Sequence, residues 1–258
     1  MNRHSSTSGL TAALAAIAIL LAACSDDTND PATSPPSTSE PSPTGAGSAT
    51  NAAPEADYSI IDDVYRTGPG RWALTADGDP TAPMAVFDVP ASFQARESFV
   101  WTDVGGYRDF GRGFGQLTYW APTRVLADPC NVDKPSPPLG PTVEDLAAAL
   151  AAQQRTTTTE PVPVELDGHR GLYLELQSPT RFDYAACAGG PDGGMLIWEA
   201  GEAGDGRGLE APTTDRYWIV DVDGERVVVT ALTVRGAVSE VIKRVIGVAK
   251  TTTFVDPE

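Results

Sequence analysis

Histidine and carboxylate side chains are the groups of this chain that could carry out acid–base chemistry. Besides His4, near the start, the 258 residues contain one histidine, His169, in the segment LDGHRG. One histidine excludes a multi-histidine metal site and leaves a single candidate for a Ser-His-Asp triad, but the G-x-S-x-G motif is absent from the sequence. We therefore interpret His169 as a solvated residue of a turn, and we expect neither a metal nor a cofactor.

Paired carboxylates are the other catalytic possibility. Glu175 and Glu199 could act as the acid and the base of a glycoside hydrolase. The sequence does not fix the distance between them, and charges of this kind usually form a solvated acidic face. We expect a protein that is not an enzyme, and the alternative is a secreted hydrolase of glycan or ester bonds.

The segment TDVGGYRDFGRGFG, residues 102–115, combines five glycines with arginines and aromatic rings. It contains neither G-x-x-x-x-G-K-[ST] nor G-x-G-x-x-G, so it predicts no phosphate site. Two interpretations stay open: the glycines shape a turn and a crowded strand, or the segment is a recognition loop rich in Tyr and Arg. We expect Phe114 in the core, and we expect Tyr107, Arg108 and Phe110 at an exposed tip that binds a partner.

The N-terminus has the layout of a lipoprotein signal peptide. Arg3 precedes the apolar run LTAALAAIAILLAAC, which is too short for a comfortable membrane span. Its last four residues, LAAC, are typical of a bacterial lipobox, in which the cysteine is lipidated and becomes the new N-terminus. We expect cleavage of residues 1–23 and a lipid on Cys24, which holds the protein at the extracytoplasmic face of the cell membrane.

Residues 24–56 are rich in Ser, Thr, Pro and Ala and contain no large apolar side chain. Such a segment cannot bury enough surface to fold, so it predicts a disordered tether. Residues 57–258 then form the globular domain. The chain carries a formal net charge of −17, which argues against a nucleic-acid partner because binding to phosphates requires clusters of Lys and Arg.

Cys130 and Cys187 are the two cysteines that remain after Cys24 is assigned to the lipid. An even pair inside one secreted domain most simply forms a disulfide.

Two segments have helical periodicity. The first, PTVEDLAAALAAQQR (141–155), repeats apolar residues along one face, and Thr142 with Asp145 resembles a capping box. The second, AVSEVIKRVIGVAK (237–250), has the same spacing. Extended runs at 84–93 and 115–130 are interrupted by Pro90 and Pro122, because proline cannot continue a central ladder, and TTTFVD near the end predicts a terminal strand.

Two further segments predict β-hairpins around Asp-Gly turns. In VPVELDGHRGLYLEL (162–176), a three-residue loop ending in Gly168 would place Val162 and Val164 on the face of Leu172 and Leu174, with Glu165 opposite His169. In RYWIVDVDGERVVVTAL (216–232), a two-residue turn at Asp223 and Gly224 would pair Asp221 with Arg226 and Trp218 with Val229.

These elements predict an α+β domain with a single antiparallel β-sheet and two main helices packed on it. The lipobox, the tether, FDVPASF, the first helix, both hairpins and the closing helix resemble the actinobacterial surface lipoproteins with PsbP-like α+β domains, over most of residues 83–256. The resemblance implies a non-catalytic binding or accessory module and carries no catalytic residues. We therefore expect a membrane-anchored module of the cell envelope that binds an envelope protein or another envelope component.

Overall fold

Strands are the predominant secondary structure of the described residues in the computed structural model. The structure describes residues 57–61, 66–76, 81–96, 99–102, 111–187, 194–201 and 206–257. The predicted signal peptide, the tether and Cys24 lie outside these residues, and so do Tyr107, Arg108 and Phe110 of the predicted recognition tip.

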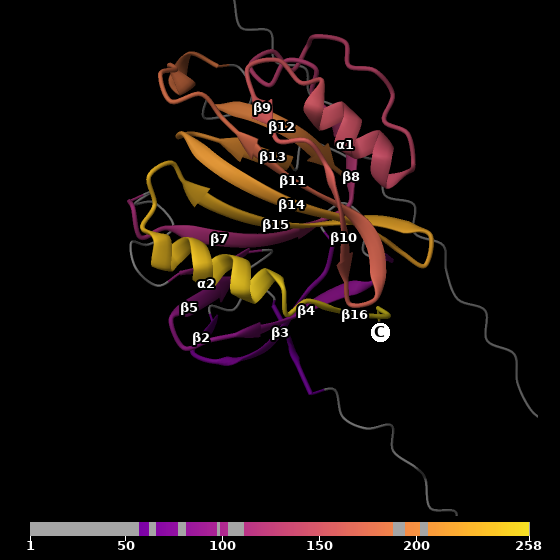
Figure 1. Cartoon of the computed structure of the whole chain (residues 1–258), viewed down its shortest axis with the longest axis vertical. Helices are drawn as coiled ribbons and strands as arrows, with labels where there is room; N and C mark the ends of the chain where they lie inside the picture. Colours follow the sequence, from indigo (N-terminus) through magenta and orange to yellow (C-terminus); the bar gives the residue numbers. More distant parts are fainter. Residues whose placement is uncertain are drawn as a thin grey trace, which may run out of the picture. The chain divides into compact units, whose positions relative to one another are not determined.

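Nine strands of the described chain form an antiparallel sheet (Figure 1). Its order is β10 (Val162–Leu166), β11 (His169–Gln177), β14 (Thr213–Val222), β15 (Glu225–Val234), β7 (Gly115–Trp120), β6 (Phe99–Thr102), β5 (Phe93–Arg96) and β2 (Arg66–Thr67), and β9 (Thr157–Thr158) pairs with β11.

Two smaller sheets accompany the nine-stranded sheet. The four-stranded sheet has the order β1 (Ser59–Ile60), β3 (Gly70–Leu74), β4 (Met84–Val89) and β16 (Thr253–Val255). The three-stranded sheet has the order β13 (Gly206–Leu209), β12 (Met195–Ala200) and β8 (Pro122–Val125). The helices of the described chain are α1 (Val143–Ala151), α2 (Ser239–Ala249) and a short 3₁₀ turn, η1 (Tyr184–Ala186).

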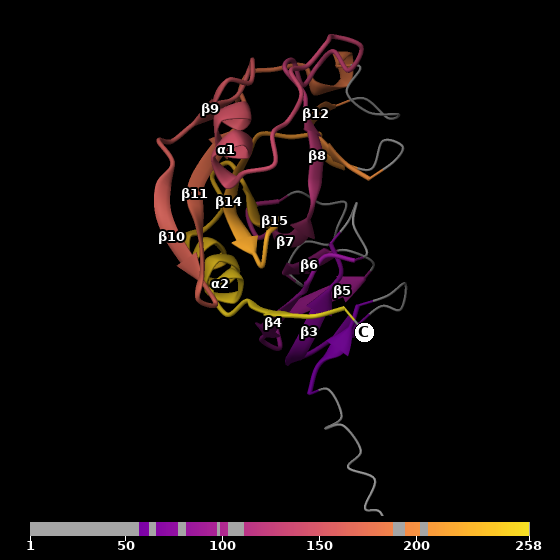
Figure 2. The ribbon, with the colours of Figure 1, turned by 90° about the vertical axis from the view of Figure 1, so that its right-hand side faces the viewer.

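The two faces of the nine-stranded sheet bury different hydrophobic clusters. On one face, which we call the α2 face, α2 and the four-stranded sheet pack against residues such as Leu117 and Val229. On the other, the α1 face, α1 and the three-stranded sheet pack against residues such as Tyr217 and Val228. Figure 2 shows α1 and α2 at different heights along the sheet. Because Val228 and Val229 are adjacent and both fully buried, β15 is covered on both faces.

The prediction of a single sheet with two helices packed on it is wrong. Helices cover only part of each face, and the four-stranded and three-stranded sheets cover the rest. Pro122 marks the change of sheet, since β7 ends at Trp120 in the nine-stranded sheet and β8 begins at Pro122 in the three-stranded sheet. Several strands are only two to four residues long, so they show too little alternation to be recognised from the sequence.

The hairpin β14–β15 confirms its predicted register. Asp221 pairs with Arg226 and Trp218 pairs with Val229. The turn residues Asp223 and Gly224 have φ angles of 54° and 95°, as the favoured two-residue hairpin turn requires.

The predicted register of the hairpin β10–β11 is wrong. Its loop is a two-residue turn, in which Leu166 pairs with His169 and Glu165 pairs with Arg170. Val162 and Val164 therefore lie on the face opposite Leu172. The reason is that both faces of this hairpin contribute to the core: Leu166 is buried in the cluster of the α2 face, while Leu172 packs against the cluster of the α1 face.

Candidate functional site

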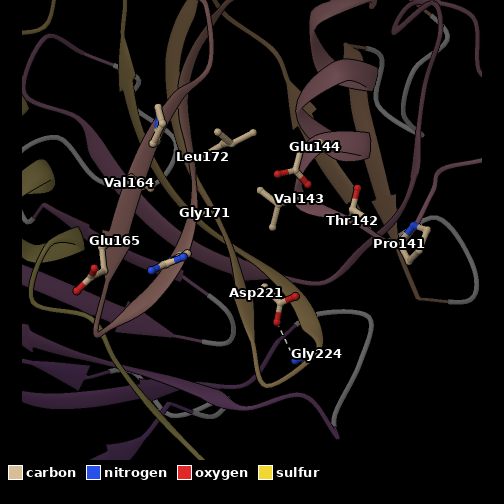
Figure 3. A pocket seen from close by; sticks show the side chains of 12 residues that line it. Pro141, Thr142, Val143, Glu144, Val164, Glu165, Gly171, Leu172, Asp221 and Gly224 are labelled. Atoms are coloured by element: carbon tan, nitrogen blue, oxygen red, sulfur yellow. Dashed lines mark hydrogen bonds between the residues drawn. The ribbon is translucent and has the colours of Figure 1, made fainter.

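A groove of about 810 Å³ lies between the N-terminal end of α1 and the β10–β11 hairpin, and the turn between β14 and β15 borders it (Figure 3). Its volume is within the range of ligand sites in proteins. Its lining consists of Pro141, Thr142, Val143 and Glu144 before and in α1, Pro163, Val164, Glu165, Arg170, Gly171 and Leu172 in the hairpin, and Asp221 and Gly224 in the turn.

The helical wall of the groove begins with the capping box that the sequence predicts at Thr142 and Asp145. The Thr142 hydroxyl accepts a hydrogen bond from the Asp145 backbone N–H at 3.1 Å, and the Asp145 carboxylate accepts one from the Thr142 N–H at 3.0 Å. The bond from the Thr142 backbone N–H holds the pKa of Asp145 below its ordinary value. The first turn of α1 therefore has its free N–H groups partly satisfied, and Val143 is held facing the groove.

Arg226 ties this wall to the sheet. Its guanidinium donates to the carbonyl oxygens of Gly140, Thr142 and Pro122, the last at 2.7 Å. Burial lowers the pKa of Arg226 from its ordinary value, and the nearby Asp145 carboxylate opposes this effect. Arg226 stays charged because a guanidinium does not lose its proton in proteins. The segment before α1 is thus fixed to β15 and to β8.

The hairpin wall depends on a close approach between strands at Gly171. A Cβ atom at this position would lie 2.0 Å from the Ile219 carbonyl oxygen of the neighbouring strand β14. Only glycine permits this approach. The hairpin can then lie against β14 and present Leu172, which is half-buried, to the groove. Figure 3 shows Leu172 and Val143 extending into the space between the two walls.

The rim of the groove is mainly acidic. Glu144, Glu165 and Asp221 are exposed around it, and Arg170 is the cation among the lining residues. Asp221 also accepts a hydrogen bond from the Gly224 N–H at 2.7 Å, which fixes the turn (Figure 3). An apolar floor with carboxylates on its rim can bind a cationic ligand that also carries apolar groups.

The groove residues come from three distant parts of the chain, so sequence reasoning missed them as a group. The capping box at Thr142 predicted the helix start that forms one wall, but it did not predict a groove. The segment predicted to bind a partner is a different one, and its tip lies outside the described residues. Phe114 of that segment is fully buried, which confirms its predicted place in the core.

Cys130 and Cys187 form a disulfide, as predicted, with their Cα atoms 4.7 Å apart. The bond closes a loop that contains α1 and the β10–β11 hairpin, so both walls of the groove lie between the two cysteines in sequence.

The structure does not bring the predicted catalytic carboxylates together. Glu175 lies on β11 of the nine-stranded sheet and pairs with Arg216 at 3.3 Å. Glu199 lies on β12 of the three-stranded sheet and pairs with Arg124 at 3.0 Å. Since Leu174 and Leu176 point to the α1 face, Glu175 points to the opposite face.

His169 is half-buried beside its turn, and its ring packs edge-on against Phe254 with the ring centroids 5.4 Å apart. The neighbouring Asp167 carboxylate accepts a hydrogen bond from the Phe254 backbone N–H at 2.8 Å. These contacts fix the hairpin turn to β16, which is a structural role.

Within the described ranges, no group of three or more His, Cys, Asp or Glu side chains is placed to hold a metal ion. In the same part of the chain, no helix has both the length and the apolar character needed to cross a membrane.

No family model matches the chain, and the comparison with curated proteins gives no match. Among solved structures, the chain matches the solution structure of cyanobacterial PsbP (CyanoP) from Synechocystis sp. PCC 6803 at 15% identity. The match covers 73% of this chain and 94% of that chain, with a TM-score of 0.29. We draw neither a family nor a function from this match.

Proposed function

We propose that this protein is a non-catalytic binding module of the cell envelope, and that its groove binds a basic, partly apolar segment of another envelope protein. The observation that carries the proposal is the composition of the groove, which has an apolar floor open to solvent and a rim with three carboxylates and one guanidinium.

The apolar floor supplies affinity. Pro141 and Pro163 are exposed and Leu172 is half-buried, so a bound side chain would remove apolar surface from water. Each square ångström of apolar surface that is buried contributes about 25 cal/mol. A groove of about 810 Å³ has room for several side chains of a peptide.

The rim supplies selection by charge. Glu144 and Glu165 stand on opposite walls, and both are exposed to an approaching ligand. Carboxylates in this position attract Lys and Arg and repel acidic segments, and the net charge of −17 adds a long-range field of the same sign.

Binding in the groove is favoured over addition of a strand to the sheet. β10 is an edge strand of the nine-stranded sheet, and Pro163 lies at its second position. Proline has no N–H to donate, so a strand added along this edge would lack a hydrogen bond there. The partner segment is therefore held through its side chains.

The place of action follows from the N-terminal sequence. Cleavage before Cys24 and lipidation of Cys24 anchor the protein to the extracytoplasmic face of the membrane, and residues 24–56 hold the domain away from the lipid surface. Labelling of cells with a fatty-acid analogue should mark the wild type and leave Cys24→Ala unmarked. Equal labelling of both would contradict the anchor.

A matched pair of peptides tests the groove. One peptide alternates Lys and Leu and the other alternates Glu and Leu at the same length, and both are titrated against the full chain. We expect binding of the Lys peptide only, and weaker binding as salt is raised.

The double variant Glu144→Gln/Glu165→Gln should weaken the binding of the Lys peptide, whereas Asp183→Asn should not. Asp183 is exposed and does not line the groove, so it controls for the loss of one negative charge at the surface. Equal binding of both peptides, or equal loss in the control variant, would refute selection by the rim.

A further inference from the structure

A second, smaller pocket of about 230 Å³ lies on the α1 face of the nine-stranded sheet, under β13 and the loop that follows it. Its walls combine aromatic rings, aliphatic side chains and polar groups. These are Phe99 and Trp120, Leu209 and Leu232, and Gln116 and Arg207. This pocket shares no lining residue with the groove described above.

The residues around this pocket include polar atoms that are buried without a partner. Trp120 lines the pocket and is 4% exposed, and its indole N–H has no hydrogen-bond partner within the described part of the chain. Gln116, also 4% exposed, places an amide in the lining. An unpartnered buried N–H costs free energy unless a ligand or water accepts its hydrogen bond.

The strands beside the pocket carry more groups of this kind on the same face. Thr118 and Thr230 are paired across β7 and β15, and both hydroxyls are buried without a partner among the described residues. Asp215 on β14 is paired with Leu232 of the lining, and its Oδ1 atom is also buried and unpartnered. This face of the sheet therefore carries unpartnered donors and acceptors beside the pocket.

The charges at the pocket disfavour an anionic ligand. The Arg207 Nε donates to Asp215 Oδ2 at 2.9 Å, so the guanidinium is already neutralised by a fully buried carboxylate. Glu210, which is exposed, adds a negative charge to the lining. A carboxylate ligand would face two carboxylates for one guanidinium, and that guanidinium is already paired with Asp215.

From these observations we infer that the pocket binds a single uncharged pyranose ring, either as a free sugar or as the end residue of a glycan. Hydroxyl groups both donate and accept, so one ligand of this class can accept from the indole N–H of Trp120 and also hydrogen-bond to the amide of Gln116. A dry cavity of about 150 Å³ holds benzene, so a pocket of about 230 Å³ has room for a six-membered ring with hydroxyl groups.

The test titrates the full chain with glucose, galactose and mannose, with their methyl glycosides, and with glucuronate and cyclohexanol as charged and apolar controls. Tryptophan fluorescence and saturation-transfer NMR report binding, because Trp120 lies in the pocket wall. We expect saturable binding of at least one neutral sugar and about tenfold weaker binding of its charged counterpart. Binding of the methyl glycoside identifies the end of a glycan as the ligand, and binding of the free sugar alone identifies a free sugar.

Two variants place the binding in this pocket. Gln116→Leu should weaken it about tenfold, as expected for one lost hydrogen bond. Ala211→Phe, at a half-buried position of the lining, should abolish the binding by filling the pocket. This change leaves the core intact, so it still tests the inference if Gln116→Leu does not fold. Glu144→Gln, in the groove, should leave sugar binding unchanged. Failure of every neutral sugar to bind, equal binding of cyclohexanol, or wild-type binding by Ala211→Phe would overturn the inference.

Discussion

Reduction of the disulfide between Cys130 and Cys187 should strongly destabilise the domain. The two cysteines are 57 residues apart, and closing a loop of this length removes about 14 cal/mol/K of entropy from the unfolded chain. At 25 °C this corresponds to about 4 kcal/mol of stability. The loop contains α1, β9, β10 and β11, which include both walls of the groove. Reduction of the disulfide should therefore also destabilise the groove.

Denaturant unfolding in a Cys24→Ala background, which leaves only these two cysteines, measures the effect. Reductant should lower the unfolding midpoint of this protein, whereas a further Cys130→Ala/Cys187→Ala variant should start at the lower midpoint and ignore reductant. If mass spectrometry shows both thiols free and the midpoint does not move, the disulfide does not stabilise the fold.

Three other changes test the core, the helix wall and the buried tyrosines. Phe114→Ala should cost about 3 to 5 kcal/mol in denaturant unfolding, because the ring is fully buried, while Val238→Ala, at a 41% exposed position, should change stability by less than about 0.5 kcal/mol. Thr142→Ala should cost about 1 kcal/mol through loss of the helix cap, and Thr142→Ser should restore it; equal stability of all three proteins would refute the capping box. Burial raises the pKa of Tyr217 well above its ordinary value, and burial together with the hydrogen bond to Glu175 raises that of Tyr173. The contribution of these neutral tyrosines to the free energy of unfolding is therefore complete below pH about 10 and is lost as the pH rises further. Titration followed by absorbance should show tyrosines that ionise only together with unfolding. Complete ionisation in the folded protein would contradict the burial.

Local patterns in the sequence predict the local structure well. The capping box at Thr142 and Asp145 locates the start of α1, and the apolar spacing around Val241 and Val245 predicts α2. The Asp223-Gly224 turn fixes the β14–β15 register, because both of its strands are long and a two-residue turn leaves no choice of pairing.

Long-range arrangement is what the sequence does not reveal. The β10–β11 register depends on which face each apolar residue finds covered, and α2 and the four-stranded sheet provide that cover for Leu166 from distant parts of the chain. The same limit hides the groove, since Glu144, Glu165 and Asp221 belong to three elements whose proximity appears only in the fold. No local spacing predicts such a site.

Site-specific crosslinking in cells tests directly whether the groove binds a basic segment of an envelope protein. A photo-crosslinking amino acid at Pro141, an exposed residue of the groove, should capture an envelope protein, and mass spectrometry should place the crosslink in a segment that combines Lys or Arg with apolar residues. The same group at Val238, an exposed apolar residue outside the groove, should capture nothing comparable. Crosslinks from position 141 to acidic segments, or equal capture from both positions, would contradict a groove that binds a basic partner.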